Sequence, residues 1–370
     1  MKKKLFLLFC ALLPFLLSSS QTDNQEVMIL YLLPFHLNEG FVSNTSFKNR
    51  EEIEQVRQFE MMGFWLGAKM ALQELENSNR KIKAIVRDAV TDKYALNKIL
   101  NDKHLMENVN IIIGPIYGSL FPVAAEFAKN NNITIVNPFS TRFDFVEKNS
   151  AVYKLVPPLI SRPKTVVEHF LAKPENFNII LWGDSTTSIE LQAYKYFLNE
   201  QNIRFKEVHT LTIPQDMRKT NLIIAFFDRQ ERVIHGVHTL INQEEEYDRI
   251  VIVPEKWLSV SELTEDFYNL PELYFFANYF VDENCDRVKQ FRSDYTFFYE
   301  APAELSEYSF QGYDITRYFI DLYFVDFNTD NLHFQPLSYQ FQWKKLLDGG
   351  FENTKTRLIQ VKDLELEEVK

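Results

Sequence analysis

Residues 110–138 read NIIIGPIYGSLFPVAAEFAKNNNITIVNP, and this stretch predicts the fold of the chain. Two short apolar runs, 110–113 and 133–136, flank a helical pattern at 120–129. Short, continuously apolar runs of this kind are typical of buried parallel strands. A strand, a helix and a second strand in this order predict a parallel sheet with the helix packed on one face.

The same alternation extends in both directions from this stretch. In the first part of the chain it predicts strands at 27–33, 82–86 and 152–156, and helices at 51–75 and 94–106. Pro157 and Pro158 then interrupt it, because neither a strand nor a helix easily accommodates two prolines. It restarts with strands at 178–182, 205–211, 222–227, 249–253 and 273–279, and helices at 189–201, 229–241 and 258–267. The predicted fold class is therefore α/β, with two doubly wound parallel-sheet lobes.

The last part of the chain departs from this alternation. Helical patterns at 287–299 and 308–327 follow one another without a strand between them. From residue 334 onward, alternating aromatic and polar residues around Gly349-Gly350 predict a C-terminal antiparallel ribbon. We expect multiple hinge crossovers, near Pro157, Asp282 and Asn331. The expected N-terminal lobe is residues 21–157 plus 283–331, and the expected C-terminal lobe is residues 158–282 plus 332–370.

The first twenty residues have the pattern of a secretory signal peptide. Lysines at positions 2–4 precede an apolar run at 5–17, and serines follow at 18–20. The apolar run is shorter than the roughly 20 residues that a transmembrane helix needs. We therefore expect residues 1–20 to be cleaved, the protein to be periplasmic, and no direct insertion into a membrane. A buried N-terminal helix is the alternative interpretation.

Composition and motifs exclude several classes of protein. The chain has 40 basic and 51 acidic residues and a formal net charge of −11, which argues against nucleic acid and anionic lipid as partners. Cys285 is the only cysteine beyond the signal segment, so no intramolecular disulfide is expected. There is no nucleophile elbow, phosphate loop or dinucleotide fingerprint. His235 and His238 lack a third metal ligand nearby in the sequence. We expect a non-enzyme with no catalytic residues, no metal and no cofactor.

Several stretches resemble the type I periplasmic binding protein superfamily, which includes the branched-chain amino-acid binding proteins. They are 64–72 (FWLGAKMAL), 112–115 with 133–138, 291–302 with Gly312-Tyr313-Asp314, and 349–353 (GGFEN). The chain is also similar to the related domain of a lipoprotein activator of peptidoglycan synthases. The resemblance implies two lobes that close around a small molecule. We expect a monomer.

The candidate site lies in loops after the strands, because ligands of open α/β sheets bind beyond the carboxyl ends of the strands. In the first lobe these loops supply Phe35, then Tyr117, Gly118 and Ser119, then Phe139, Ser140 and Thr141. A helix that begins near Ser119 would present free N–H groups to a carboxylate, and Gly118 would let the ligand approach closely. The resemblance implies that the second and third loops hold the α-carboxylate and α-amino groups of a ligand. Two alternatives stay open: the hydroxyl residues are ordinary helix caps, and Phe35 and Tyr117 are core aromatics rather than cleft walls.

The second lobe is expected to close over this rim with its own loops. They supply Asp184, Ser185, Asp228 and Glu255, and an acid among them would pair with a ligand amine. Amino-acid binders of the resembling family often have Tyr-Gly where this chain has Thr186-Thr187. Two functions are therefore predicted. The first is a periplasmic solute-binding protein that captures a small polar, amino acid-like ligand by hinge closure and serves an inner-membrane permease of an ABC transporter. The second is a non-transport envelope interaction or regulatory protein with a protein partner.

Overall fold

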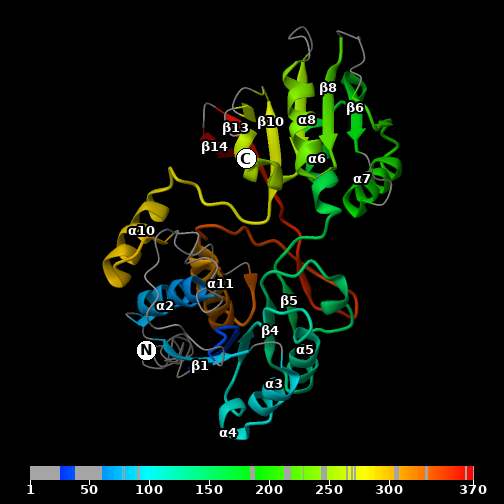
Figure 1. Cartoon of the computed structure of the whole chain (residues 1–370). Coiled ribbons are helices and arrows are strands. Elements are labelled where there is room, and N and C mark those ends of the chain that lie inside the picture. Colours follow the sequence, from blue (N-terminus) through cyan, green and yellow to red (C-terminus); the bar gives the residue numbers. More distant parts are fainter. Residues whose placement is uncertain are drawn as a thin grey trace, which may run out of the picture.

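The computed structural model consists of two α/β lobes stacked end to end (Figure 1). The described residues are 26–37, 61–76, 78, 80–89, 92–183, 188–211, 218–227, 229–242, 248–263, 266–267, 270, 272–303, 308–329, 332–362 and 365–369. The predicted signal segment, residues 1–20, and residues 51–60 of the first predicted helix lie outside them. None of the helices in the described ranges has the length and apolar character that crossing a membrane requires.

The first lobe is built on a seven-stranded sheet of order β11-β12-β5-β4-β3-β1-β2. Every neighbouring pair from β12 to β2 is parallel, and β11 pairs antiparallel with β12. The strands are β1 (Glu26–Leu33), β2 (Lys81–Asp88), β3 (Ile111–Ile113), β4 (Thr134–Asn137), β5 (Val152–Lys154), β11 (Trp343–Lys345) and β12 (Phe351–Asn353). The inner strand β3 is buried throughout, which explains why its sequence is a continuous apolar run.

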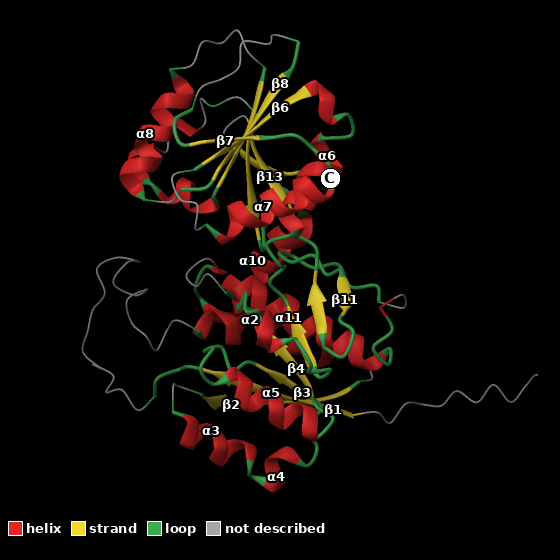
Figure 2. Ribbon diagram, turned by 90° about the vertical axis from the view of Figure 1, so that its right-hand side faces the viewer, coloured by secondary structure: helices red, strands yellow, loops and turns green. Residues whose placement is uncertain are grey.

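Helices cover both faces of the first sheet, as Figure 2 shows. The helices of this lobe are α2 (Met62–Glu76), α3 (Lys93–Leu100), α4 (Lys103–Met106), α5 (Phe121–Asn130), α10 (Asp286–Tyr299) and α11 (Ser309–Phe324). On one face, α2 and α11 share a core with β1 in which Phe64, Phe319 and Tyr31 are fully buried. On the other face, α3, α4 and α5 form a second core with the same sheet. Phe291 packs α10 against α2 and α11.

The second lobe repeats this plan with a sheet of order β14-β13-β10-β9-β8-β6-β7. The strands are β6 (Phe177–Trp182), β7 (Lys206–Val208), β8 (Thr220–Ala225), β9 (Arg249–Val253), β10 (Leu273–Ala277), β13 (Arg357–Lys362) and β14 (Glu365–Glu368). Neighbours from β10 to β7 are parallel, whereas β13 is antiparallel to both β10 and β14. Helix α8 (Gln230–Ile241) covers one face, and α6 (Ser161–Phe170) and α7 (Ile189–Glu200) cover the other.

Three connections join the lobes, and each leaves a strand at its carboxyl end. β5 ends at Lys154 before the chain enters α6, and β10 ends at Ala277 before the chain returns to α10. β12 ends at Asn353, and β13 begins in the second sheet at Arg357. Because the parallel strands of each sheet share one direction, the carboxyl edges of the two sheets face each other across the lobe boundary.

Helices α2 and α11 approach each other closely at two glycines. A methyl group at Gly67 would lie 1.8 Å from the backbone oxygen of Ser309, and one at Gly312 would lie 1.9 Å from the backbone oxygen of Phe64. Both distances are far below ordinary van der Waals contact, which is about 3.5 Å or more. The two glycines lie in the stretches that carry the family resemblance. The close contact of the two helices explains physically why both positions are glycine.

The predicted fold class is confirmed: two mostly parallel α/β lobes with short antiparallel pairs at the end of the chain. Two predicted helices differ in the structure. The helix expected at 94–106 is divided into α3 and α4 at residues 101–102. Part of the helix expected at 258–267 lies instead in the short 3-10 segments η4 (Glu255–Ser259) and η5 (Ser261–Leu263).

The tail also differs from the expectation that all residues from 332 onward join the C-terminal lobe. β11 and β12 extend the first sheet, and only β13 and β14 join the second. The Phe351 ring stacks on the Tyr153 ring of β5 at 4.4 Å, and Lys154 Nζ lies 3.1 Å from Glu352 Oε1, so β12 is held to the first lobe. The third crossing is therefore at 354–356 and not near Asn331, which lies outside the described residues.

Candidate functional site

The three predicted loops of the first lobe lie side by side at the carboxyl edge of its sheet. They follow β1, β3 and β4, which are neighbours in the order β4-β3-β1. This edge faces the second lobe, because all three crossings leave from the carboxyl ends of strands. The topology thus gathers the first-lobe candidates Phe35, 117–119 and 139–141 on one side of the molecule.

The loop after β1 is held by the carboxylate of Asp88 at the end of β2. The backbone N–H groups of Phe35, His36 and Leu37 donate to the Asp88 oxygens at 2.8, 3.2 and 2.8 Å. The Phe35 side chain is buried in the first-lobe core, in agreement with the core-aromatic alternative. The sequence interpretation did not single out Asp88, although an acid at the end of a strand beside the site was visible.

His36 and Tyr117 connect the loops after β1 and β3. Nε2 of His36 lies 2.9 Å from Oη of Tyr117, and the two rings meet edge to face. His36 is buried and has a φ of 52°, in the left-handed region that residues other than glycine rarely adopt. The hydrogen bonds of His36 to Asp88 and to Tyr117 hold this backbone conformation. The contact with His36 also fixes the half-buried ring of Tyr117.

Gly118 and Ser119 lie nearer the surface than the rest of this loop. Helix α5 begins at Phe121, and its cap residue Leu120 makes no side-chain cap hydrogen bond. The helix thus begins later than predicted, and Ser119, which is exposed, is not its cap residue. A methyl group at Gly118 would lie 3.6 Å from the Phe145 ring, which is ordinary contact.

Asn137 organises the loop after β4. Its Oδ1 accepts the backbone N–H of Ser140 at 2.7 Å, and Ser140 Oγ accepts the backbone N–H of Arg142 at 3.1 Å. Thr141, between them, is exposed. Asn137 is buried, and its Nδ2 has no hydrogen-bond partner among the described residues. A buried, unpaired donor is costly, so Asn137 is an additional candidate for ligand contact that the sequence interpretation missed.

Phe139 packs into the first lobe at the same edge. Its ring centroid lies 4.9 Å from that of Tyr308, just before α11, and 6.0 Å from that of Phe64 on α2. The ring is half-buried, so one part of it packs against these aromatics while the rest is accessible at the edge.

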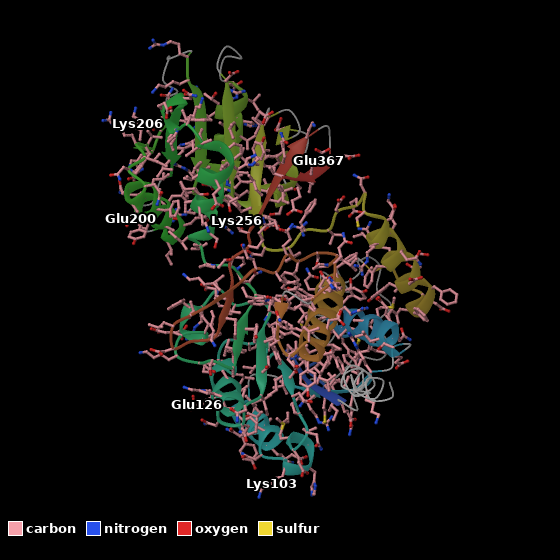
Figure 3. All side chains as sticks on the ribbon, turned by 180° about the vertical axis from the view of Figure 1, so that it is seen from behind. Lys103, Glu126, Glu200, Lys206, Lys256 and Glu367 are labelled. Carbon is pink, nitrogen blue, oxygen red and sulfur yellow. The ribbon has the colours of Figure 1, made fainter. Side chains whose placement is uncertain are left out.

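The second-lobe candidates are only partly described. Three of them, Asp184, Ser185 and Asp228, lie outside the described residues. Glu255 begins η4 and is exposed, yet partial desolvation of its carboxyl raises the pKa of Glu255, while the nearby Arg162 opposes the rise. Figure 3 shows the next residue, Lys256, at the end of the second lobe that faces the first.

A buried carboxylate anchors the segment between α11 and β11. Asp314 of α11 accepts the backbone N–H groups of Leu337, Ser338 and Tyr339 and the hydroxyl of Ser338, at distances between 2.6 and 3.0 Å. Burial raises the pKa of Asp314, and these hydrogen bonds oppose the rise. The segment 337–339 is therefore fixed to the first lobe.

Arg357 ties this segment to the second lobe. Its Nη1 donates to the backbone oxygens of Phe280 and Ser338, at 2.7 and 2.5 Å, and its Nε donates to Glu368 Oε1 at 2.8 Å. The backbone N–H of Phe280 donates to the same Ser338 oxygen at 2.9 Å. Arg357, the first residue after the third crossing, thus contacts both the second crossing at Phe280 and the first-lobe segment at Ser338.

The groups described at the first-lobe rim suit binding of a polar molecule. The hydroxyls of Tyr117, Ser119 and Thr141 and the amide of Asn137 donate and accept hydrogen bonds without a change of charge near neutral pH. Within the described ranges, no three or more His, Cys, Asp or Glu residues are placed to hold a metal ion.

Comparison of the chain with known proteins finds a relationship in structure. No family model matches the sequence, and no curated protein sequence matches it significantly. The fold matches an ABC transporter substrate-binding protein from Desulfitobacterium hafniense with a TM-score of 0.58 and 14% identity, over 93% of this chain and 100% of that one. This chain has the type I periplasmic binding protein fold.

Two further structures with this fold align with the chain over nearly its whole length. The branched-chain amino acid substrate-binding protein LivJ of Streptococcus pneumoniae, in complex with isoleucine, has a TM-score of 0.52 and 12% identity, over 94% of this chain and 100% of that one. A solute-binding protein of an ABC transporter from R. palustris, in complex with 4-hydroxybenzoate, also has a TM-score of 0.52 and 12% identity, over 94% and 96%.

Proposed function

We propose that this chain is a solute-binding protein that captures a small polar, amino acid-like ligand between its lobes by hinge closure. The observation that carries the proposal is the arrangement of two sheets whose carboxyl edges face each other across three crossings. In open α/β sheets this edge is the usual place for a ligand. The isoleucine and 4-hydroxybenzoate complexes with this fold support it, since both ligands are small carboxylates.

In this proposal the first-lobe rim provides the primary contacts. Tyr117, Ser119 and Thr141 offer hydroxyl groups, and Asn137 offers the amide donor that has no partner among the described residues. Glu255 closes from the second lobe. The role of the chain is binding and release rather than catalysis.

Ligand screening of the mature chain tests the proposal. Thermal unfolding with single amino acids, small peptides and sugars should reveal at least one that raises the melting temperature. A ligand at a hundred times its Kd stabilises the folded state by about 2.7 kcal/mol. Thr141→Ala combined with Asn137→Ala should weaken that ligand about tenfold or more, whereas Ser150→Ala, an exposed hydroxyl elsewhere on the same lobe, should not. If no compound of these classes stabilises the chain, the proposal fails.

We further propose that the chain is exported and works in the periplasm with an inner-membrane permease. The support is the signal-peptide pattern at residues 1–20 together with the fold. Mass spectrometry of the protein from the periplasmic fraction should give the mass of a chain that begins near Gln21. An unprocessed chain retained inside the cell would contradict this part of the proposal.

One observation favours the second function, an envelope interaction protein that binds a protein partner. The first-lobe rim uses several of its own donors internally, because Asp88 takes the N–H groups of 35–37 and Asn137 takes that of Ser140. A cleft that no longer binds a ligand would be expected to satisfy its own donors in this way. Recovery of one stoichiometric envelope partner, together with no stabilising ligand, would favour this function over transport. Clear small-molecule binding without a partner would exclude it.

A further inference from the structure

A cavity of about 440 Å³ lies on the second lobe. Its described lining residues all come from the carboxyl ends of β6, β7 and β8 and from α8: Trp182, His209, Thr210, Leu211, Phe227, Arg232, His235 and Thr239. The volume falls within the range of about 300–1,000 Å³ that is usual for small-molecule sites. Because these residues belong to one lobe, a ligand here needs no closure of the hinge.

One part of the cavity is apolar and aromatic. Trp182 and Phe227 are both buried, and their rings meet edge to face with centroids 4.8 Å apart. Leu211, also buried, adds an aliphatic surface. The Trp182 indole N–H donates to the backbone oxygen of His209 at 3.3 Å, which fixes the ring. Such a surface favours a planar, apolar group.

The other part of the cavity is basic. Arg232, His235 and Thr239 lie at i, i+3 and i+7 on α8, so they share one face of the helix. The Arg232 guanidinium carbon lies 5.8 Å from the centre of the Phe227 ring, which places the charge beside the aromatic surface. None of the described lining residues is acidic, although acidic residues outnumber basic ones in the whole chain, 51 to 40.

His209 completes the basic part from the end of β7. Its Nδ1 lies 2.8 Å from the backbone oxygen of Gly183. Because a carbonyl oxygen only accepts, Nδ1 carries a proton in this contact, and Nε2 remains for other contacts. The imidazole orientation is therefore set by the lobe itself before any ligand arrives.

We propose that this cavity, whose described lining comes from the second lobe alone, is a second binding site for a small aromatic anion. The ring of the ligand packs on Trp182 and Phe227, and its carboxylate or phosphate contacts Arg232 with His209 and His235. Arg232 is the side chain most suited to the anion, because its planar guanidinium donates two parallel hydrogen bonds to such a group.

Titration calorimetry with the full chain tests the site, with benzoate and phenyl phosphate as the probes. Benzyl alcohol and benzylamine are the neutral and cationic controls of similar size. We expect the anions to bind about tenfold or more tightly than either control, and Arg232→Gln to weaken them by a similar factor. Arg229→Gln is the matched control, because Arg229 is the N-cap residue of the same helix and is exposed but is not among the described lining residues of the cavity. Arg232→Lys keeps the positive charge but loses the two parallel N–H donors of the guanidinium. It should weaken binding of the anions less than Arg232→Gln does.

Three outcomes overturn the proposal. They are no binding of either anion, equal binding of benzylamine, or an equal effect of Arg229→Gln and Arg232→Gln. The two sites are distinguished by Thr141→Ala with Asn137→Ala. If that variant abolishes benzoate binding while Arg232→Gln leaves it intact, the anion binds in the interlobe cleft and the second site does not exist. If benzoate binding survives in the variant with Thr141→Ala and Asn137→Ala, the second site stands whether or not the cleft binds an amino acid-like ligand. Circular dichroism checks that each variant is folded.

Discussion

Replacing Gly67 with alanine should destabilise the first lobe, although alanine is the better helix former. The added methyl group would lie 1.8 Å from the backbone oxygen of Ser309, where an ordinary carbon–oxygen contact needs about 3.3 Å. Helices α2 and α11 would have to separate by about 1.5 Å along that line, because a backbone oxygen within a helix cannot rotate away. Alanine gains about 1 kcal/mol over glycine in a helix interior, and overpacking costs about 1–3 kcal/mol or more. Since the separation also loosens the core around Phe64, we expect a net loss of about 2 kcal/mol.

Urea unfolding followed by circular dichroism measures this loss, and hydrogen exchange with mass spectrometry assigns it to a lobe. Exchange should rise in peptides from α2 and α11 and stay unchanged in α7. Gly236→Ala on α8 is the matched control, since the nearest atoms to its methyl group are side-chain atoms of Phe227, at 2.9 Å, which can shift. The loss of stability in Gly236→Ala should be smaller than that in Gly67→Ala. If Gly67→Ala unfolds at the wild-type urea concentration, or loses no more than Gly236→Ala, the argument from close backbone approach is wrong.

Three further predictions concern buried charges. Lys154→Met should lower the free energy of unfolding by about 3–5 kcal/mol, because it leaves the buried Glu352 without its cation; adding Glu352→Leu should restore most of it in the same denaturant titration. Arg357→Met should broaden the distribution of distances between spin labels on α3 and α7, because it frees the second crossing at Phe280 and the first-lobe segment at Ser338 from the start of β13; an unchanged distribution would contradict the role of this side chain. Asp314 has a folded-state pKa above its usual 3.8, so the folded chain binds this proton more tightly than the unfolded chain. Its contribution to stability is therefore largest below that value and declines as pH rises through the folded-state pKa. Asp314→Asn should remove this decline, which thermal melts of both proteins from acidic to neutral pH would measure. If the melting temperature of the variant falls with pH as steeply as that of the wild type, the assignment to Asp314 is wrong.

Hydrophobic pattern predicted the architecture because it reports burial directly. Runs such as 27–33 and 110–113 are buried on both sides of the sheet, and they become β1 and β3. The placement of the tail could not be predicted in this way. β11 and β12 join the first sheet through contacts such as Phe351 on Tyr153, between residues almost 200 positions apart. An alternating ribbon has the same pattern whichever lobe it extends.

The candidate site was harder to predict than the fold. The expectation that ligands bind beyond the carboxyl ends of the strands places the candidates at the edge of the first sheet that faces the second lobe. It does not say which way a side chain points, and Phe35 turns into the core. Asp88 and Asn137 were missed because their importance comes from hydrogen bonds to loop backbone, and for Asp88 the partners lie more than 50 residues away. A polar residue at the last position of a strand is the signal that could have found both of them.

The order in which the sheets receive their strands has a consequence for biosynthesis. The first sheet lacks β11 and β12 until residue 353 has been made, and the second lacks β13 and β14 until residue 368. Until then β10, buried along its whole length in the finished lobe, has an open edge that could pair with another chain. Neither sheet is complete before these strands have been made, so neither lobe can reach its native form early in translation. A deletion that removes β13 and β14 should therefore leave this edge of β10 open and produce aggregation rather than a stable fragment.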